Sequence, residues 1–399
     1  MRIAMLGQKG MPAIHGGVES HVHDLSLHLV SDGHEVTVYS RKWYTGGKDT
    51  NFDGVKIKYT RGIHTKHLDA ITHTLTATLS AMHGNFDILH YHGVGPALLA
   101  WIPRLFARKK KVIITFHSID RYHDKWNWIA RIFLRLGEKA ACTIPHKTIT
   151  VSQSIENYCV NECNKNTTYI PNGVYLSNTT NKNINNINQF GLEKNNYFVM
   201  VSRLIKHKGV HLLIEAFNNL KKHNSSNEKI QKLKLAIVGG SAYTNKYVKE
   251  LHQLAAKSND IIFTDFQSGN ILEDLYRNAL TLVHPSLNEG LPITVLQGMS
   301  YAQPVLVSNI TEHKELISDN RFIFRENDID DLEKSMLNFI EMPDSEKNKI
   351  GKENKIIIEK LYHWDKITPQ IIIAYESVLK KTKLKTPKAI PERRSTTTS

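Results

Sequence analysis

The chain alternates short apolar segments with longer segments in which apolar residues recur every three or four positions. The first short segment is Arg2–Leu6, and a set of apolar residues follows it at helical spacing: Val18, Val22, Leu25 and Leu29. Such runs predict a buried strand, and such spacing predicts an amphipathic helix. Gly33 ends the helix and Glu35–Ser40 is the next apolar run, so the chain opens on a strand–loop–helix–strand unit.

The alternation continues through the first half. Further strands are predicted at Asp87–His92, Lys111–Phe116, Thr148–Val151 and Thr168–Ile170. Helices are predicted at Pro96–Arg108 and Trp126–Ala140. Nearly continuous apolar strands that alternate with helices predict a parallel sheet covered on both faces.

Residues 177–196 are rich in Asn, Thr and Ser, a composition that buries no core, so we expect a linker there. The second half restarts with strands predicted at Tyr197–Val201, Leu233–Val238, Ile261–Thr264, Leu280–Val283 and Pro304–Val307. Helices are predicted between and after them at Gly209–Leu220, Tyr243–Lys257, Ile293–Ala302 and Asp330–Ile340.

These patterns predict an α/β protein of two Rossmann-like domains with parallel sheets, facing each other across a cleft. We place the domains at residues 1–178 and 190–362. The last helix, within residues 363–380, is expected to cross back to the first domain. The basic tail at 381–399 is expected to be disordered.

The formal net charge is +14, and the excess of Lys and Arg lies in the first 180 residues and the last twenty. This distribution favours an anionic partner, either acidic lipid or a phosphorylated acceptor. Nucleic acid is not expected, because the chain has no zinc finger, RNP motif or basic stripe interleaved with aromatics.

The N-terminus does not resemble a signal peptide, since the short run Arg2–Leu6 ends at Gly7. No apolar run approaches the roughly 20 residues that span a bilayer. We therefore expect a cytoplasmic protein. The segment Pro96–Arg108 is apolar with a basic end, which fits a helix lying in the membrane interface. The alternative is an ordinary helix that covers the sheet. If the segment does lie in the membrane interface, we expect a peripheral location on the inner face of the cell membrane.

Two places in the first half have the character of ligand sites. Gly16 and Gly17 open a helix after the first strand, where backbone approaches a ligand closely and a helix N-terminus favours anions. The dinucleotide pattern G-x-G-x-x-G is not present there, which disfavours an NAD-type enzyme. His117 follows the strand Lys111–Phe116, and ligands of open α/β sheets bind at such carboxyl ends.

Two more candidate sites follow strands of the second half. Arg203 and Lys208 bracket a short loop at a helix start, and two cations beside free amides make a phosphate site. Glu289 precedes a tight loop, Gly290–Pro292, that opens onto another helix. A carboxylate there suits sugar hydroxyls better than phosphate.

Taken together and in order, these stretches resemble the family-4 glycosyltransferases of the GT-B fold. The similar stretches are DILHYHG, TFHS, ITVSQS, IPNGV, VSRLIKHKGVHLLIEAF, HPSLNEGLPITVLQGMSYAQPVLVS and YHWDKI. The opening MRIAMLGQKGMPAIHGGVESHV more narrowly resembles rhamnosyl- and related transferases of bacterial capsule and lipopolysaccharide clusters. The resemblance extends from Met1 to about Lys380.

The resemblance implies roles for individual residues. Four residues match the family's catalytic positions: His117, at the donor sugar or reaction centre, the diphosphate pair Arg203 and Lys208, and Glu289, at the donor sugar. Further donor-binding positions are Gly16, Gly17, Gly290, Ile293, Thr294 and Val295. The second Glu of the family's motif falls on Gln297, which keeps one carbonyl acceptor and loses the charge.

The resemblance also implies transfer of a sugar from a nucleotide-diphosphate sugar to a glycan or lipid-linked acceptor in cell-surface polysaccharide synthesis. Anomeric configuration would be retained, by front-face attack. We expect no metal and no cofactor. Asp328 and Asp330 lie at a polar helix start, which predicts capping. His21, His23, His28, His90 and His92 lack metal-ligand spacing with a third ligand nearby.

Two other functions remain open. A sugar-nucleotide epimerase of the same fold would need acid–base carboxylates in the cleft. A catalytically degenerate scaffold is favoured only by Gln297.

Overall fold

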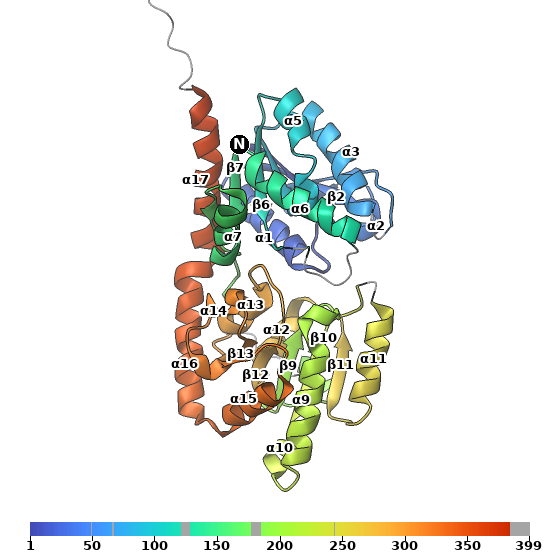
Figure 1. The fold of residues 1–399 in the computed structure, drawn as a ribbon, viewed down its shortest axis with the longest axis vertical. Coiled ribbons are helices and arrows are strands. Elements are labelled where there is room, and N and C mark those ends of the chain that lie inside the picture. Colours follow the sequence, from blue (N-terminus) through green and yellow to red (C-terminus); the bar gives the residue numbers. More distant parts are fainter. Residues whose placement is uncertain are drawn as a thin grey trace, which may run out of the picture.

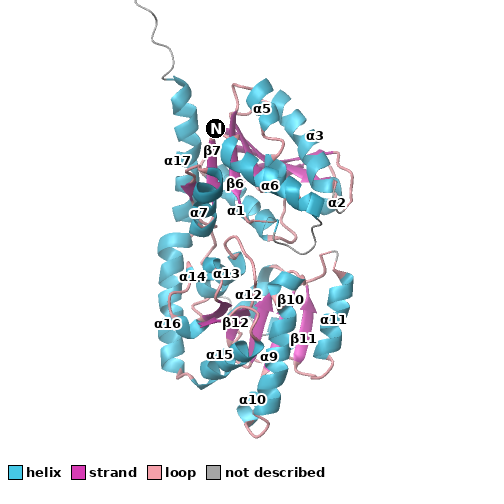
Figure 2. Ribbon diagram, viewed as in Figure 1, coloured by secondary structure: helices cyan, strands magenta, loops and turns pink. Residues whose placement is uncertain are grey.

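The computed structural model describes residues 1–48, 50–65, 68–119, 121, 128–176, 185–242 and 244–383. The chain forms two lobes, one above the other in Figure 1, with the helices α16 and α17 along one side of both. Each lobe contains a sheet with helices packed against it, as Figure 2 shows. The predicted α/β architecture of two Rossmann-like domains is confirmed.

The first sheet has the order β3-β4-β2-β1-β5-β6-β7-β8, and every pair is parallel except the hairpin β3–β4. Its strands are β1 (Arg2–Leu6), β2 (Glu35–Arg41), β3 (Thr50–Phe52), β4 (Val55–Thr60), β5 (Ile88–His92), β6 (Lys111–Phe116), β7 (Lys147–Thr150) and β8 (Thr168–Tyr169). Alternate residues of β1 enter different cores: Ile3 and Met5 pack on one face, Ala4 and Leu6 on the other. This is the side-chain alternation of a strand covered on both faces.

Between these strands, the described residues of this lobe form the helices α1 (Gly17–Ser31), α2 (Lys42–Thr45), α3 (Asp69–His83), α4 (Val94–Ala97), α5 (Trp101–Phe106), α6 (Trp128–Thr143) and α7 (Gln153–Cys163). Helix α1 packs on the face that buries Ile3 and Met5. Helices α3 and α4 supply core residues to the opposite face, and α6 packs on α4 there.

The second sheet is entirely parallel in the order β11-β10-β9-β12-β13-β14. Its strands are β9 (Tyr197–Val201), β10 (Lys234–Val238), β11 (Ile261–Asp265), β12 (Thr281–His284), β13 (Val305–Ser308) and β14 (Ile323–Phe324). Its helices are α8 (Asn185–Asn188), α9 (Val210–His223), α10 (Glu228–Lys232), α11 (Asn245–Ala255), α12 (Gly269–Arg277), α13 (Ile293–Ser300), α14 (Thr311–Lys314), α15 (Ile329–Glu341) and α16 (Asp344–Ile357).

The final helix, α17 (Trp364–Lys383), lies beside the first lobe although the chain reaches it from the second (Figure 1). It contributes six buried side chains to the core of α1 and the first sheet: Trp364, Ile367, Ile371, Ala374, Tyr375 and Val378. The hydroxyl of Tyr375 lies 2.8 Å from Nδ1 of His90 on β5. The end of the described chain therefore completes the first lobe. The tail from residue 384 lies outside the described residues.

Two expectations from the sequence were wrong. The segment 177–196 was expected to bury nothing, but Ile187 and Leu192 are 0% and 1% exposed in the second core; residues 177–184 lie outside the described residues. The helix expected at Pro96–Arg108 is divided into α4 and α5. Pro103 has no amide to donate to Leu99, whose carbonyl instead accepts from Ile102 in a tight turn at 3.1 Å.

In the part of the chain that the structure describes, no helix combines the length and the apolar composition that a transmembrane span requires.

Candidate active site

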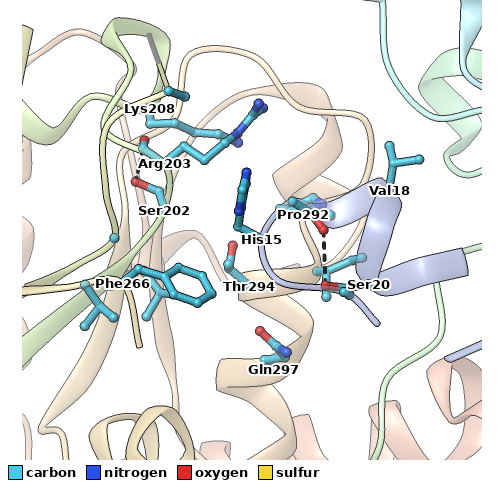
Figure 3. Close-up of a pocket in the computed structure, with 18 of the residues that line it drawn as sticks. His15, Val18, Ser20, Ser202, Arg203, Lys208, Phe266, Pro292, Thr294 and Gln297 are labelled. Atoms are coloured by element: carbon cyan, nitrogen blue, oxygen red, sulfur yellow. Dashed lines mark hydrogen bonds between the residues drawn. The ribbon is translucent and has the colours of Figure 1, made fainter. Parts of the chain in front are cut away.

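A cleft lies between the lobes, where loops that follow β1 and β6 face loops that follow β9, β10, β11 and β12. These loops leave the carboxyl ends of parallel strands, which is where open α/β sheets bind ligands. The structure brings ten of the predicted residues to this cleft: Gly16, Gly17, His117, Arg203, Lys208, Glu289, Gly290, Ile293, Thr294 and Gln297. Figure 3 shows Arg203 and Lys208 above His15, with Phe266, Thr294 and Gln297 below it.

Gly16 and Gly17 form the start of α1 at the edge of the cleft. Gly16 has φ +110°, and a Cβ added there would lie 2.0 Å from a carboxylate oxygen of Glu19. Only glycine fits that position without strain. A Cβ on Gly17 would lie 3.8 Å from Cδ1 of Ile293 in the other lobe, so this backbone borders the gap directly.

His117 directly follows β6 and contacts a group of buried histidines. Its Nε2 lies 3.1 Å from Nδ1 of His92, whose ring packs against His90 at a centroid distance of 4.1 Å. The His21 ring of α1 lies 4.9 Å from that of His117. His21, His92 and His117 place one nitrogen each within 4.8 Å of one another, a donor set of the kind that zinc accepts.

Burial lowers the pKa of His21, His90 and His92 because it disfavours the charged imidazolium. The pKa of His21 falls to about 4 and that of His90 to about 3. On the other side of the cleft, burial lowers the pKa of His313 to about 3. The native protein therefore holds neutral imidazoles on both sides of the site.

We predict that the protein loses stability between pH 7.5 and pH 5.0. The unfolded chain takes up protons on its histidines below about pH 6.5 while the native state does not, so stability falls with pH. Each of His21, His90 and His313 contributes a loss of about 2 kcal/mol at pH 5.0. Burial raises the pKa of Asp24 to about 7, which opposes the trend by about as much as one histidine. Urea midpoints at the two pH values measure the difference, and equal midpoints would contradict buried neutral histidines.

Arg203 and Lys208 lie on the loop between β9 and α9. A short 3-10 turn, Lys206–Lys208, ends at Gly209 with φ +72°, where a Cβ would lie 2.1 Å from the carbonyl of Pro285. That glycine lets the loop turn sharply into α9. Within the described part of the chain, the guanidinium of Arg203 has no carboxylate within ion-pair distance. It therefore brings an uncompensated positive charge to the cleft.

Glu289 is held by two partners. Nζ of Lys208 and Nε2 of His284 both bind its Oε1, the latter at 2.9 Å. Burial alone would raise the pKa of Glu289, but the positive charge of Lys208 and the His284 hydrogen bond outweigh burial and hold that pKa well below its usual range. Both contacts use Oε1, so the ionised carboxylate presents Oε2 as a further acceptor.

The loop after Glu289 brings α13 to the cleft. The amides of Ile293 and Thr294, the first two of this helix, form no hydrogen bond with the described part of the chain, so they are free to bind an anion. Val295 does not line the cleft, in contrast to the expectation. Its side chain is fully buried and its amide donates to the carbonyl of Pro292 at 3.1 Å.

Gln297 lies one turn further along α13. The hydroxyl of Tyr276 donates to its Oε1 at 3.2 Å. This bond occupies one of the two lone pairs of that oxygen, so Gln297 presents the other lone pair and its amide N–H groups to a ligand.

Three features that line the cleft were not predicted from the sequence: His15, Phe266 and the pair Gly239–Gly240. The Phe266 ring is 44% exposed directly after β11, and the His15 ring reaches it across the lobes at a centroid distance of 6.2 Å. Gly239–Gly240 follows β10 directly, and its position after a predicted strand could have marked it as a candidate for the cleft.

The acidic pair in the last part of the domain is not in this cleft. Asp328 is the N-cap of α15, and its Oδ1 accepts the amide of Asp331 at 2.9 Å. The predicted capping role is confirmed for Asp328.

Two family models match adjacent parts of the chain. Glycosyltransferase Family 4 matches residues 15–178, and Glycosyl transferases group 1 matches residues 182–356. The chain belongs to the family-4 glycosyltransferases, with the GT-B fold. The two matches of this glycosyltransferase correspond to its two lobes, so the cleft between them is its candidate active site.

Curated relatives of this glycosyltransferase include three bacterial proteins. It is 22% identical to spore coat protein SA of Bacillus subtilis (strain 168), over 94% of this chain and 99% of the relative. It is 26% identical to the O-antigen chain mannosyltransferase RfbU of Salmonella typhimurium, over 58% of this chain and 62% of the relative. It is 25% identical to the UDP-Gal:alpha-D-GlcNAc-diphosphoundecaprenol alpha-1,3-galactosyltransferase of Escherichia coli, over 61% and 64%.

Two solved structures show the same fold. Sucrose-phosphate synthase from Thermosynechococcus elongatus superposes with a TM-score of 0.80 at 18% identity, over 95% of this chain and 99% of that one. HepE from Anabaena in complex with UDP-glucose superposes with a TM-score of 0.74 at 19% identity, over 94% and 100%.

Proposed function

We propose that this glycosyltransferase moves a sugar from a nucleotide-diphosphate sugar to a glycan acceptor, with retention of anomeric configuration, in cell-surface polysaccharide synthesis. One observation carries the proposal. Arg203, Lys208 and the free amides at the start of α13 converge on the same cleft, and all of them stabilise anions.

The diphosphate is the leaving group of the proposed reaction. When the bond to the sugar breaks, negative charge grows on the outer phosphate. Fixed cations and amides that already point at this position stabilise the charge without reorganising. We assign this role to Arg203 and Lys208, with the Ile293 and Thr294 amides at the second phosphate.

Glu289 orients the donor sugar in this proposal. Lys208 and His284 fix its Oε1, and Oε2 accepts a sugar hydroxyl. His117 faces the same space from the first lobe, where its imidazole, oriented by the contact with the buried His92, can hydrogen-bond the sugar or the acceptor. The nucleoside would lie lower in the cleft, with its base beside the exposed Phe266 ring and its ribose near Gln297.

The acceptor is proposed to bind the first lobe and to be lipid-linked. One relative is named for a diphosphoundecaprenol acceptor, and others for O-antigen chains, which supports both the class of acceptor and the pathway. Such an acceptor is assembled at the cytoplasmic face of a membrane, and we place the enzyme there.

We propose that the reaction needs no metal and no cofactor, because Arg203, Lys208 and the amides of α13 together supply the charge that a metal would supply.

Two observations bear on the alternative that the protein is an epimerase. Among the described residues that line the cleft, Glu289 is the one carboxylate, and Lys208 and His284 already engage it. An epimerase would need such a group free for proton transfer, so transfer is favoured.

The test is turnover with a panel of UDP-, GDP- and dTDP-sugars, with and without a polyprenyl-diphosphate glycan acceptor. We expect release of nucleoside diphosphate that depends on the acceptor, persists with EDTA and gives a product whose anomeric NMR signal matches the donor. Sugar interconversion without acceptor would indicate an epimerase. Tight nucleotide binding with no turnover would indicate a scaffold, and loss of turnover with EDTA would contradict the metal-free proposal.

A further inference from the structure

Helix α6 carries a run of apolar side chains that the protein does not bury. Five of the nine residues from Trp128 to Leu136 are large, apolar and exposed: Trp128 at 71%, Ile129 at 47%, Ile132 at 52%, Phe133 at 57% and Leu136 at 51%. A helix that only covered a sheet would turn such residues inward. Contiguous exposed apolar surface of this kind marks a site of interaction.

The basic residues of the same helix are exposed, whereas its acidic residue is buried. Arg131, Arg135 and Lys139 are exposed. Arg135 lies 4.0 Å from Glu162, in a pair whose side chains are 72% and 48% exposed. The one acidic residue of α6, Glu138, is fully buried and accepts from the hydroxyl of Tyr158 at 2.6 Å. The exposed part of α6 is therefore apolar and cationic together, which is typical of a helix that lies in a membrane interface.

Helix α5, which lies beside the C-terminal end of α6, exposes further apolar side chains. It exposes Trp101, Leu105 and Phe106, the last at 72%, and the chain directly after it exposes Arg108 and Lys109. Nε of Arg104 donates to the carbonyl of Ile144, just after α6, at 2.8 Å, so the two helices are neighbours. Both helices cross between successive parallel strands β5, β6 and β7 on one face of the first sheet, and α6 crosses in front of that sheet in Figure 1.

The apolar part of α6 lies in the half of the helix that is nearer to the cleft. Strand β6 ends beside His117, which lines the cleft, and α6 then runs back to the start of β7. In a parallel crossover the first half of the helix lies near the carboxyl edge of the sheet. Trp128–Leu136 is that first half, so the exposed surface adjoins the opening to which an acceptor would come.

We propose that the exposed face of α5 and α6 docks on an anionic lipid bilayer, with Trp128–Leu136 lying in the interface and Arg131 and Arg135 at the headgroups. This rests on the proposed lipid-linked acceptor, which the docking would deliver beside the cleft. A second copy of the chain is a poorer occupant, because a symmetric contact would set Arg131 and Arg135 against the same cations of the partner. Anionic headgroups instead complement them.

The experiment is flotation of the full chain with vesicles of phosphatidylglycerol and phosphatidylcholine, compared with phosphatidylcholine alone. We expect binding to the anionic vesicles at low salt, with a blue shift of tryptophan fluorescence, and release as salt rises. The double variant Arg131→Gln/Arg135→Gln should partition about 25-fold more weakly, which is about fivefold for each charge. Ile132→Ser/Phe133→Ser should lose the fluorescence shift.

Matched control variants test whether weaker flotation is specific to α6 or follows from any loss of charge or apolar surface. Lys246→Gln/Lys249→Gln removes two exposed lysines from α11 in the other lobe, and Ile373→Ser removes an apolar side chain that is 65% exposed on α17. Both should float like the parent, and all variants should keep its melting temperature. Failure of the parent to float, or equal flotation of the α6 variants, overturns the proposal. A dimer that the α6 variants dissociate also overturns it in favour of a second copy.

The same variants separate this proposal from the proposed function. With the acceptor dissolved in detergent, the α6 variants should turn over like the parent. If flotation fails while this turnover is present, only the docking surface is wrong. If no form of the protein transfers sugar, the proposed function itself is wrong.

Discussion

Replacing Lys208 with alanine should lower turnover by about 10²–10³-fold, the usual effect of removing one preorganised donor from a developing anion. Two losses combine in this variant. The leaving diphosphate loses a cation, and Glu289 loses one of the two partners that hold its Oε1 in place. The measurement is the turnover number at saturating donor, because most of the lost interaction belongs to the transition state.

Lys206→Ala is the matched control, since Lys206 occupies the same 3-10 turn and is exposed. It should retain parental turnover and melting temperature. A Lys208→Ala protein that folds normally and turns over within a fewfold of the parent would remove Lys208 from the mechanism.

Gly290→Ala should lower turnover by about 10²-fold because it prevents the lobes from meeting. A Cβ on Gly290 would lie 1.6 Å from the carbonyl of His117, across the cleft, and a backbone carbonyl cannot give way as a flexible side chain does. The lobes would have to separate by an ångström or more, a misplacement that costs about two orders of magnitude in rate. Nucleotide affinity should change little, because Arg203, Lys208 and α13 all belong to the second lobe.

Gly240→Ala is the control for this prediction. Gly240 also lines the cleft, a Cβ there would meet nothing within 4 Å, and its φ is not positive. It should retain activity. Parental turnover in Gly290→Ala would show that the close approach of the lobes at His117 is not needed for the reaction.

The sequence predicted the sheets well because their strands are continuous apolar runs. Arg2–Leu6, Lys111–Phe116 and Tyr197–Val201 match the observed strands in both bounds. Residues 42–86 yielded no prediction, although they contain β3, β4 and α3. Helix α3 is rich in Thr, which has low helix propensity, and its stability comes from packing against the sheet rather than from local preference.

The wrong prediction for residues 177–196 also has its cause in tertiary packing. The composition of residues 177–196 is polar, so two apolar residues within it, Ile187 and Leu192, did not suffice to predict that the segment packs on the second core. Tertiary contacts decided the outcome there, as Asn186 shows by donating to Asp274 of α12 at 2.6 Å. Such a contact joins positions far apart in sequence and leaves no periodic signal.

The candidate site was easier to predict where its residues follow strands. His117, Arg203 and Glu289 lie after β6, β9 and β12, so the rule for carboxyl ends placed them at one cleft. The engagement of Glu289 by Lys208 and His284 was not predictable, because it depends on how two loops pack. The grouping of His21, His92 and His117 was missed for the same reason, since their separation along the chain has no metal-ligand spacing.

The affinity of the free nucleoside diphosphate, measured by calorimetry on the parent and on Arg203→Ala, tests most directly whether the cleft holds a diphosphate. Arg203 has no ion-pair partner within the described chain, so its removal should weaken binding without destabilising the fold. We expect an affinity about 10- to 100-fold lower in Arg203→Ala, with the melting temperature unchanged. Equal affinity in the two proteins would contradict it.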